Sequence, residues 1–229
     1  MIKRISGPLC SVLLGLVLGC GPGNTDAKPK LTFIQYELAQ RLAEDTRTDS
    51  FTLEVDRGRV LGDTTAKLWV VMVSDFQCQS CRQWFEEVFP ALRTEYAATG
   101  KVRIAFVNLP LANHLNAQAA AIAAGCASTQ GRFWEASARI FDTQDRWKDL
   151  PDARPFLDSL AILAGADAKT QRSCSDQAKP LRLIGLDRER AKAAGVDSVP
   201  TFLIGRHRLS GDATLATFRA VIDSALVGR

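Results

Sequence analysis

Two cysteines separated by two residues, Cys78 and Cys81, constrain this sequence more than any other feature. They follow the apolar run Leu68–Val73, which is typical of a buried strand. After them, apolar residues recur at helical spacing: Phe85, Val88, Phe89, Leu92 and Tyr96. The start of a helix has unpaired N–H groups and a partial positive charge, and both stabilise a thiolate at Cys78. The motif therefore predicts dithiol–disulfide exchange, with half of a metal site as the competing interpretation.

The N-terminal residues have the features of an export signal. A short basic head precedes the apolar run 9–18, which is too short to span a bilayer and is typical of a signal-peptide core. The ending Val17–Cys20 resembles a bacterial lipobox, so we predict that residues 1–19 are removed and that Cys20 is lipid-modified. Ordinary cleavage a few residues further on, with Cys20 discarded or free, is the alternative. Both interpretations predict an oxidising compartment, in which disulfides persist.

Residues 20–50 are expected to be a lipid-anchored tether followed by a short amphipathic helix at Leu31–Glu44. No later segment approaches the length of apolar sequence that a transmembrane helix needs. Lys and Arg exceed Asp and Glu by only four, and no basic run is interleaved with aromatic residues. The composition therefore gives no indication of nucleic-acid binding.

Hydrophobic periodicity predicts the element order of one α/β domain over residues 51–229. We expect strands at Phe51–Val55, Leu68–Ser74, Val102–Leu109, Thr201–Gly205 and Arg208–Ser210. We expect helices at Cys78–Ala98, His114–Thr129, Arg132–Phe141, Ala153–Leu163, Asp167–Ser175, Pro180–Ala194 and Leu215–Leu226. Pro90 should kink the first of these helices, because proline has no N–H to donate. The helices between the third and fourth strands predict a helical insertion at about 112–182.

The helix after the third strand is expected to begin at Asn113, as its N-cap, with Leu115, Ala119, Ile122 and Cys126 on its apolar face. Cys174 lies in another predicted helix of the insertion. In an exported protein, Cys126 and Cys174 are expected to form a structural disulfide. The alternative is two buried thiols that act as small hydrophobic groups.

The stretch Val199–Gly205 is the second diagnostic feature, because a proline directly precedes a predicted central strand. Taken with the cysteine motif, it resembles the DsbA-like thiol:disulfide oxidoreductases of the thioredoxin superfamily. The residues that carry this resemblance are 74–78 with Cys81, 199–202 and 208–211, and it extends over about residues 50–229. The resemblance implies a thioredoxin-like α/β fold with an inserted helical domain, and a redox-active disulfide in place of any cofactor.

The resemblance also implies roles for individual residues. Cys78 would form the mixed disulfide with a substrate, and Cys81 would be the buried resolving thiol. Pro200 would be cis and face the disulfide, and the backbone of Val199 would bind an extended substrate by strand addition.

Two departures from the family pattern affect the expected chemistry. Gln79 and Ser80 are expected at the substrate-binding surface. They stand where the most oxidising relatives have a proline–histidine pair, and they offer the Cys78 sulfur only neutral hydrogen bonds. We therefore expect the helix start to lower the pKa of Cys78 to a value between about 3.5, as in DsbA, and about 7, as in thioredoxin. Met72 occupies the position of a buried glutamate found in many relatives. Asp75 is nearer to the thiols but is expected at the strand end in contact with water.

Three other side chains are of residue types that often act in catalysis, but we assign them no catalytic role. His114 is expected in the first turn of a helix, and His207 between two arginines is expected to be exposed. Trp84 is predicted to be part of the core. No second cysteine pair or histidine cluster supports a metal site.

Three functions follow as hypotheses. The first is an envelope thiol oxidase that passes a disulfide to exported proteins and is reoxidised by a membrane quinone-linked thiol oxidase. The second is a reductase or isomerase, supplied with electrons by a membrane thiol reductase. The third is a non-enzymatic protein that binds a metal or a partner. We favour the first of these functions. We also expect the protein to be a monomer that is lipid-anchored at the periplasmic face of the cell envelope.

Overall fold

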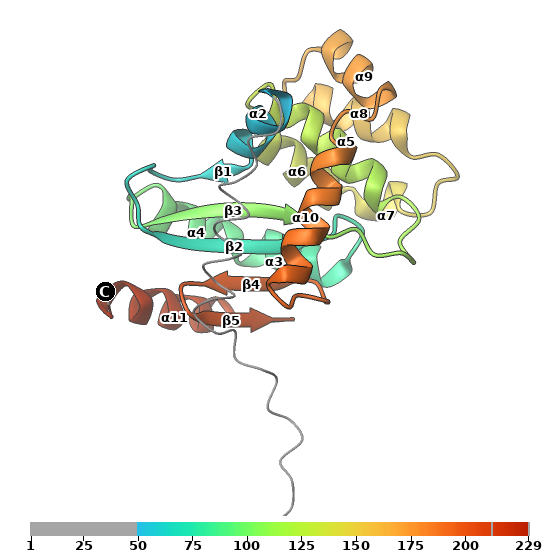
Figure 1. Cartoon of the computed structure of the whole chain (residues 1–229). Helices are drawn as coiled ribbons and strands as arrows, with labels where there is room; N and C mark the ends of the chain where they lie inside the picture. Colours follow the sequence, from blue (N-terminus) through green and yellow to red (C-terminus); the bar gives the residue numbers. More distant parts are fainter. Residues whose placement is uncertain (1–49, 212, 229) are drawn as a thin grey trace, which may run out of the picture. The chain divides into compact units, whose positions relative to one another are not determined.

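The computed structural model describes residues 50–211 and 213–228 (Figure 1). Cys20 and the expected helix Leu31–Glu44 lie outside the described residues. Five strands form one mixed sheet in the order β1-β3-β2-β4-β5. The strands are β1 (Val60–Leu61), β2 (Leu68–Ser74), β3 (Val102–Asn108), β4 (Thr201–Ile204) and β5 (His207–Ser210). Among the described residues, no helix is both long and apolar enough to cross a membrane.

The pairing of the central strands brings distant segments to one edge of the sheet. Strand β2 runs parallel to β3 and antiparallel to β4. The last residue of β2, Ser74, pairs with Asn108 at the end of β3, and Val73 pairs with Thr201 at the start of β4. The segment that follows β2 and the segment that precedes β4 therefore meet at the same edge.

Helices cover both faces of this sheet (Figure 1). On one face, α3 (Gln79–Glu87), α4 (Phe89–Leu92) and α11 (Leu215–Val227) bury aromatic residues against β2 and β4. On the other face, α10 (Leu181–Ala193) packs small side chains against apolar residues of β2, β3 and β4. In Figure 1, α10 lies in front of the sheet and α3 and α4 lie behind it. The core is therefore divided into two layers by the sheet.

The helix predicted at Cys78–Ala98 is interrupted, as Pro90 led us to expect. Helix α3 ends before Val88, α4 begins with Phe89 and Pro90, and a π-helical turn, η1, follows at Arg93–Ala97. Proline can occupy the first turn of a helix, where its missing N–H has no partner to lose. The predicted kink is confirmed.

The helices between β3 and α10 form a compact block. They are α5 (Ala117–Ser128), α6 (Phe133–Asp142), α7 (Gln144–Trp147), α8 (Arg154–Leu163) and α9 (Ala168–Asp176). Helix α5 is alanine-rich and almost wholly buried, and it contacts α6, α8 and α9. A disulfide between Cys126 of α5 and Cys174 of α9 joins two of these helices, with an S–S distance of 1.99 Å.

The strand predicted at Phe51–Val55 is wrong. These residues belong to a helix, α2 (Ser50–Gly58). It buries Thr52 and Val55, three residues apart, and the hydroxyl of Ser128 in α5 donates a hydrogen bond to the Val55 carbonyl at 2.7 Å. Packing against α5 thus decides the structure of a segment whose five-residue alternation also suits a strand.

The predicted start of the helix after β3 is also wrong. Helix α5 begins at Ala117 after Asn116, so Asn113 is not its cap, and Leu115 is 68% exposed. The Asn116 side chain instead donates to three backbone carbonyls around the end of α7, those of Trp147, Lys148 and Leu150. Neither α7 nor the two-residue strand β1 was expected from the periodicity.

A buried ion-pair cluster joins α10 to the C-terminal end of α2 and to β3. The carboxylate of Asp187 accepts hydrogen bonds from Arg59, from Arg190 at 3.0 Å and from the Asn108 backbone N–H at 2.9 Å. Burial alone would lower the pKa of Arg59, but the carboxylates of Asp187 and Asp56 raise it above its ordinary value.

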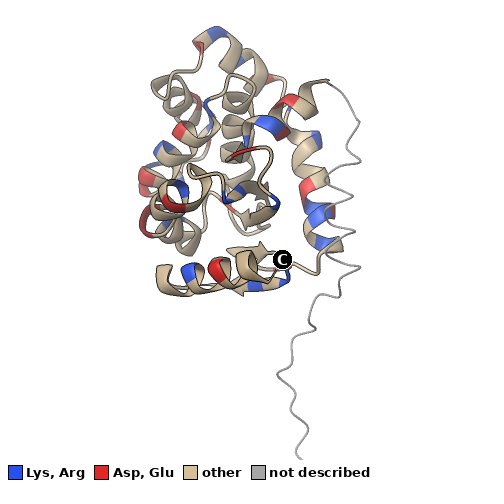
Figure 2. Cartoon of the chain, turned by 90° about the vertical axis from the view of Figure 1, so that its left-hand side faces the viewer, with Lys and Arg blue, Asp and Glu red and all other residues tan. Residues whose placement is uncertain are grey.

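On the surface, basic and acidic residues are interspersed along the helices (Figure 2).

Candidate active site

The two motif cysteines occupy different environments at the start of α3. Cys78 is the N-cap of this helix, and its Sγ accepts a hydrogen bond from the Cys81 backbone N–H at 3.3 Å. The Cys78 side chain is partly exposed, whereas Cys81 is fully buried in the first turn. Both are free thiols in this structure. A molecule approaching from solvent can therefore contact Cys78 but not Cys81.

The pKa of Cys78 is lowered to about 7. The largest cause is a hydrogen bond from the Cys81 thiol, and the backbone N–H groups of Cys81 and Ser80 lower the pKa further. Burial and the negative charge of Asp75 act in the opposite direction. The neighbouring thiol thus lowers this pKa more than either single N–H group of the helix start, which we had expected to be the chief cause. The value lies at the upper end of the expected range.

The pKa of Cys81 is raised well above its ordinary value. Burial is the main cause, and the hydrogen bond and the charge of Cys78 add to it. At neutral pH the site therefore pairs one accessible sulfur that is readily ionised with one inaccessible sulfur that keeps its proton. Such a division of roles suits a nucleophile or leaving group at Cys78 and a protonated partner at Cys81.

The segment before β4 lies next to Cys78. The Val199–Pro200 peptide bond is cis, and the carbonyl oxygen of Val199 lies 3.9 Å from Cys78 Sγ. Pro200 is buried and Val199 is partly buried, while Gln79 and Ser80 of the motif are exposed. The four residues expected at the substrate-binding surface thus surround or adjoin the accessible thiol.

Asp75 was expected to contact water, but it is buried. Its carboxylate accepts hydrogen bonds from several donors. Oδ1 accepts from the Gln77 N–H at 2.7 Å, and Oδ2 accepts from the Leu111 N–H at 2.8 Å. Oδ2 also lies 2.7 Å from Nδ1 of His114. The carboxylate therefore ties the motif segment to the loop that follows β3.

Gln144 of the helical block and Asn116, just before α5, make three further hydrogen bonds to the motif segment that the sequence analysis missed. The buried side-chain amide of Gln144, in α7, donates to the carbonyls of Phe76 at 2.8 Å and Cys78 at 3.1 Å. The side-chain oxygen of Gln77 accepts from the Asn116 N–H at 2.7 Å. Nothing in the local sequence marks Gln144, because its partners lie more than 60 positions earlier in the chain.

The remaining candidates lie apart from these thiols or form their apolar surroundings. Met72 and Trp84 are buried in the core, as expected, and Trp84 packs against Phe202 with 4.5 Å between ring centroids. Cys126 and Cys174 are bonded to each other. His207 is exposed in β5. Among the described residues, no three His, Cys, Asp or Glu side chains gather as a metal site requires.

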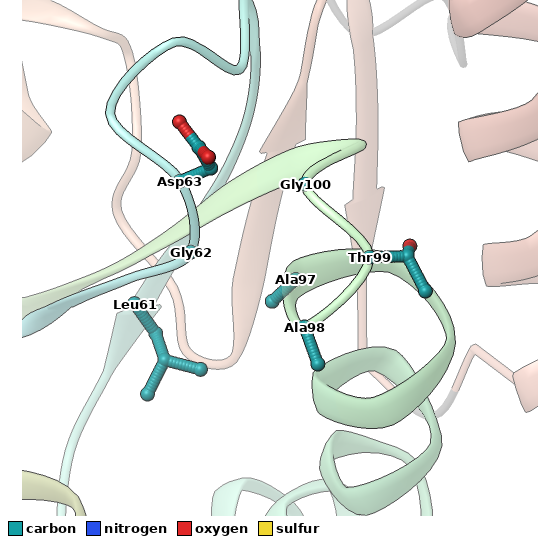
Figure 3. A pocket seen from close by; sticks show the side chains of 7 residues that line it. All are labelled: Leu61, Gly62, Asp63, Ala97, Ala98, Thr99 and Gly100. Carbon is teal, nitrogen blue, oxygen red and sulfur yellow. The ribbon is translucent and has the colours of Figure 1, made fainter.

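A pocket lies at the opposite edge of the sheet (Figure 3). It is lined by Leu61, Gly62, Asp63, Ala97, Ala98, Thr99 and Gly100. These residues precede β2 or β3, whereas Cys78 follows β2, so the length of the strands separates the pocket from the thiols. The Asp63 carboxylate accepts hydrogen bonds from Thr65 in its own turn. The pocket has no part in the thiol site.

Comparisons with known proteins identify the family and the fold of this chain. The sequence profile of the thioredoxin family matches residues 54–224. A probable disulfide bond formation protein D from Bacillus cereus is 34% identical over 174 residues, which are 72% of this chain and 77% of that protein. A Na⁺/H⁺ antiporter NhaA 3 from Salinispora tropica is 28% identical over 207 residues, which are 85% of this chain and 30% of the antiporter. The chain therefore spans less than a third of that relative's length.

Among solved structures, α-DsbA1 from Wolbachia pipientis superposes on this chain with a TM-score of 0.66 at 23% identity. The superposition covers 74% of this chain and 91% of that one. The two proteins therefore share their fold.

Proposed function

Because the chain belongs to the thioredoxin superfamily as a DsbA-like member, we propose that it exchanges disulfides with cysteine-containing exported proteins through Cys78 and Cys81. The observation that best supports this proposal is the contrast between the two thiols. Cys78 is accessible with a pKa of about 7, while Cys81 is buried with a raised pKa. Exchange with a macromolecule requires one sulfur that can be reached and one that can close the intramolecular disulfide.

As an oxidase, the protein begins with Cys78 and Cys81 joined. A substrate thiolate attacks the accessible sulfur of Cys78, so a mixed disulfide forms and Cys81 leaves as a thiolate. A second substrate thiolate then attacks the substrate sulfur of the mixed disulfide. Cys78 leaves readily because a thiol of lowered pKa is a good leaving group. In this proposal Val199 binds the substrate backbone beside Cys78, with Gln79 and Ser80 at the rim.

Two observations bear on the direction of electron flow, and they support opposite directions. The name of the Bacillus cereus relative, disulfide bond formation protein D, supports the oxidase. The Cys78 pKa of about 7 favours the second candidate, a reductase, because it resembles that of thioredoxin more than the value of about 3.5 in DsbA. We place the oxidase first, with a membrane quinone-linked thiol oxidase as the partner that restores the disulfide.

We further propose a location and an organisation for the protein. Residues 1–19 are a signal peptide, Cys20 bears the lipid anchor, and 20–50 form the tether at the periplasmic face of the envelope. Residues 51–229 are the thioredoxin-like domain, with the helical insertion at about 112–182 positioning the motif. The protein acts as a monomer.

The equilibrium of the thiol pair with glutathione tests the proposed function. A potential nearer to that of DsbA, about −120 mV, supports the oxidase, and one near that of thioredoxin, about −270 mV, supports the reductase. A Cys81→Ser variant should also retain mixed disulfides with client proteins at Cys78, and a Cys78→Ser variant should retain none. Failure to recover any mixed disulfide from envelope extracts would contradict both directions.

A further inference from the structure

A buried hydroxyl without a partner lies at the end of the central strand. Ser74 is the last residue of β2 and is 0% exposed. Its backbone carbonyl accepts a hydrogen bond from the Leu109 N–H at 2.8 Å. Among the residues that the structure describes, its side-chain hydroxyl has no hydrogen-bond partner of good geometry. Burying an unpaired hydroxyl destabilises a fold, so its presence calls for a physical reason.

Side chains alternate along β2, so the Ser74 side chain lies on the same face of the strand as Met72, which packs in one core cluster with Cys81. Burial raises the pKa of Cys81, and Cys78 adds to that effect, but the Ser74 hydroxyl and the backbone of Asp75 act in the opposite direction. The hydroxyl therefore lies where it favours a negative charge on the Cys81 sulfur. Met72, two residues earlier in the strand, is fully buried and apolar. The strand thus contributes an alcohol, rather than a carboxylate, to the surroundings of Cys81.

We propose that Ser74 is a hydrogen-bond donor for the Cys81 thiolate during exchange, an inference that rests on the proposed function. When a substrate thiolate attacks Cys78, a sulfur–sulfur bond forms to the substrate and the Cys78–Cys81 bond breaks. The electron pair of the broken bond leaves on the Cys81 sulfur, so one thiolate is consumed and one is produced. The developing charge is buried, and the Ser74 hydroxyl, which has no other partner among the described residues, can rotate to donate to it. The Cys81 thiolate then takes a proton from water, as its raised pKa requires.

This role predicts a kinetic effect without an equilibrium effect. At neutral pH the reduced Cys81 is a neutral thiol, which gains little from a donor. The oxidised state has no charge on either sulfur. Ser74 should therefore change the rate at which the disulfide opens and leave the potential of the Cys78–Cys81 pair unchanged.

Ser74→Ala tests the proposal, with Ser137→Ala as the matched control. Ser137 is also 0% exposed and its hydroxyl also has no partner among the described residues, but it lies in α6. Both variants should unfold at higher temperature than the wild type, because each loses an unpaired buried hydroxyl. Only Ser74→Ala should open its disulfide more slowly. We expect its rate constant with dithiothreitol at neutral pH to fall about tenfold, equivalent to ~1.4 kcal/mol.

A second measurement reads the Cys81 sulfur directly. In a Cys78→Ser background, the thiolate absorbance of Cys81 should titrate at higher pH when Ser74 is replaced by alanine. Ser74→Thr, which keeps the hydroxyl, should preserve the titration midpoint and the rate of opening. These comparisons separate loss of the donor from a change in packing.

Several results would overturn the proposal. They are an unchanged opening rate in Ser74→Ala, an equal loss of rate in Ser137→Ala, or a shift in the potential of the thiol pair that accounts for the slower opening. A wild-type disulfide that reacts with dithiothreitol no faster than that of an unstructured peptide would instead contradict the proposed function.

Discussion

Replacing Cys81 tests the electrostatics of the thiol site. Its thiol is the largest single cause of the lowered Cys78 pKa, ahead of either backbone N–H group at the start of α3. Cys81→Ala removes this donor and leaves the backbone N–H groups in place. Cys81→Ser keeps a donor at the same position and is the matched control. The two variants therefore differ chiefly in one hydrogen bond to the Cys78 sulfur.

The expected size of the effect follows from the environment of Cys78. A hydrogen bond to a charged group contributes about 1.5–3 kcal/mol. Because Cys78 is partly exposed, solvent screens the interaction, and we use ~1.4 kcal/mol, a tenfold change in the acid constant. The wild-type pKa of about 7 should then rise to about 8 in Cys81→Ala. It should remain near the wild-type value in Cys81→Ser.

Alkylation by iodoacetamide between about pH 5 and about pH 10 measures this titration. Cys81 is buried, so the modified mass reports on Cys78. At pH 7 about half of the wild-type Cys78 is thiolate, compared with about a tenth in Cys81→Ala, so each protein should react at that fraction of its own maximum rate. A wild-type midpoint near the free-cysteine value of about 8.5 would refute the argument. Identical midpoints for the alanine and serine variants would refute the contribution of the Cys81 thiol.

Three further predictions concern stability. Replacing both Cys126 and Cys174 by alanine should lower the free energy of unfolding in urea by up to about 4 kcal/mol, from a bridge between residues 48 apart, and leave the glutathione equilibrium of the motif unchanged. Asp187→Ala removes the fully buried one of the two carboxylates that pair with the Arg59 guanidinium, so that only Asp56 remains, and should cost up to about 3–5 kcal/mol in the same assay, whereas Asp145→Ala, at an exposed carboxylate, should cost far less. Gln144→Ala should cost about 1–3 kcal/mol and broaden the amide resonances of the motif segment, because two carbonyls lose their buried donor; unchanged stability would show that water replaces that donor.

The parts of the fold that could be predicted depend on local patterns. Strand β2 has the predicted bounds, and the helices α6, α8, α9, α10 and α11 begin and end within one residue of their expected positions. Strand β2 is an unbroken apolar run up to its last residue, and α6 buries one strongly apolar face, so both patterns are contained in the local sequence. The predicted class, a thioredoxin-like α/β fold with an inserted helical domain, is confirmed by the family match and by the fold shared with α-DsbA1.

Where short segments depend on distant packing, prediction failed. Alternation over Phe51–Val55 also suits a helix that buries every third or fourth residue, and contact with α5 selects the helix. His114 was expected inside a helix, but it lies in the loop before α5, where its side chain contacts the Asp75 carboxylate. A single sequence shows neither the contact with α5 nor the one with Asp75, because both partners lie far along the chain.

The same distinction explains which features of the site could be predicted. The thiols were predictable because Cys78 and Cys81 act on each other across a single helical turn. The groups that hold the motif were not, since the Leu111 and Gln144 contacts span 36 and 66 positions. The largest single influence on the Cys78 pKa comes from its neighbour in the motif, and the charge of Asp75, only three positions before Cys78, opposes it. The helical block therefore positions the reactive sulfur, and the motif itself sets the acidity of that sulfur.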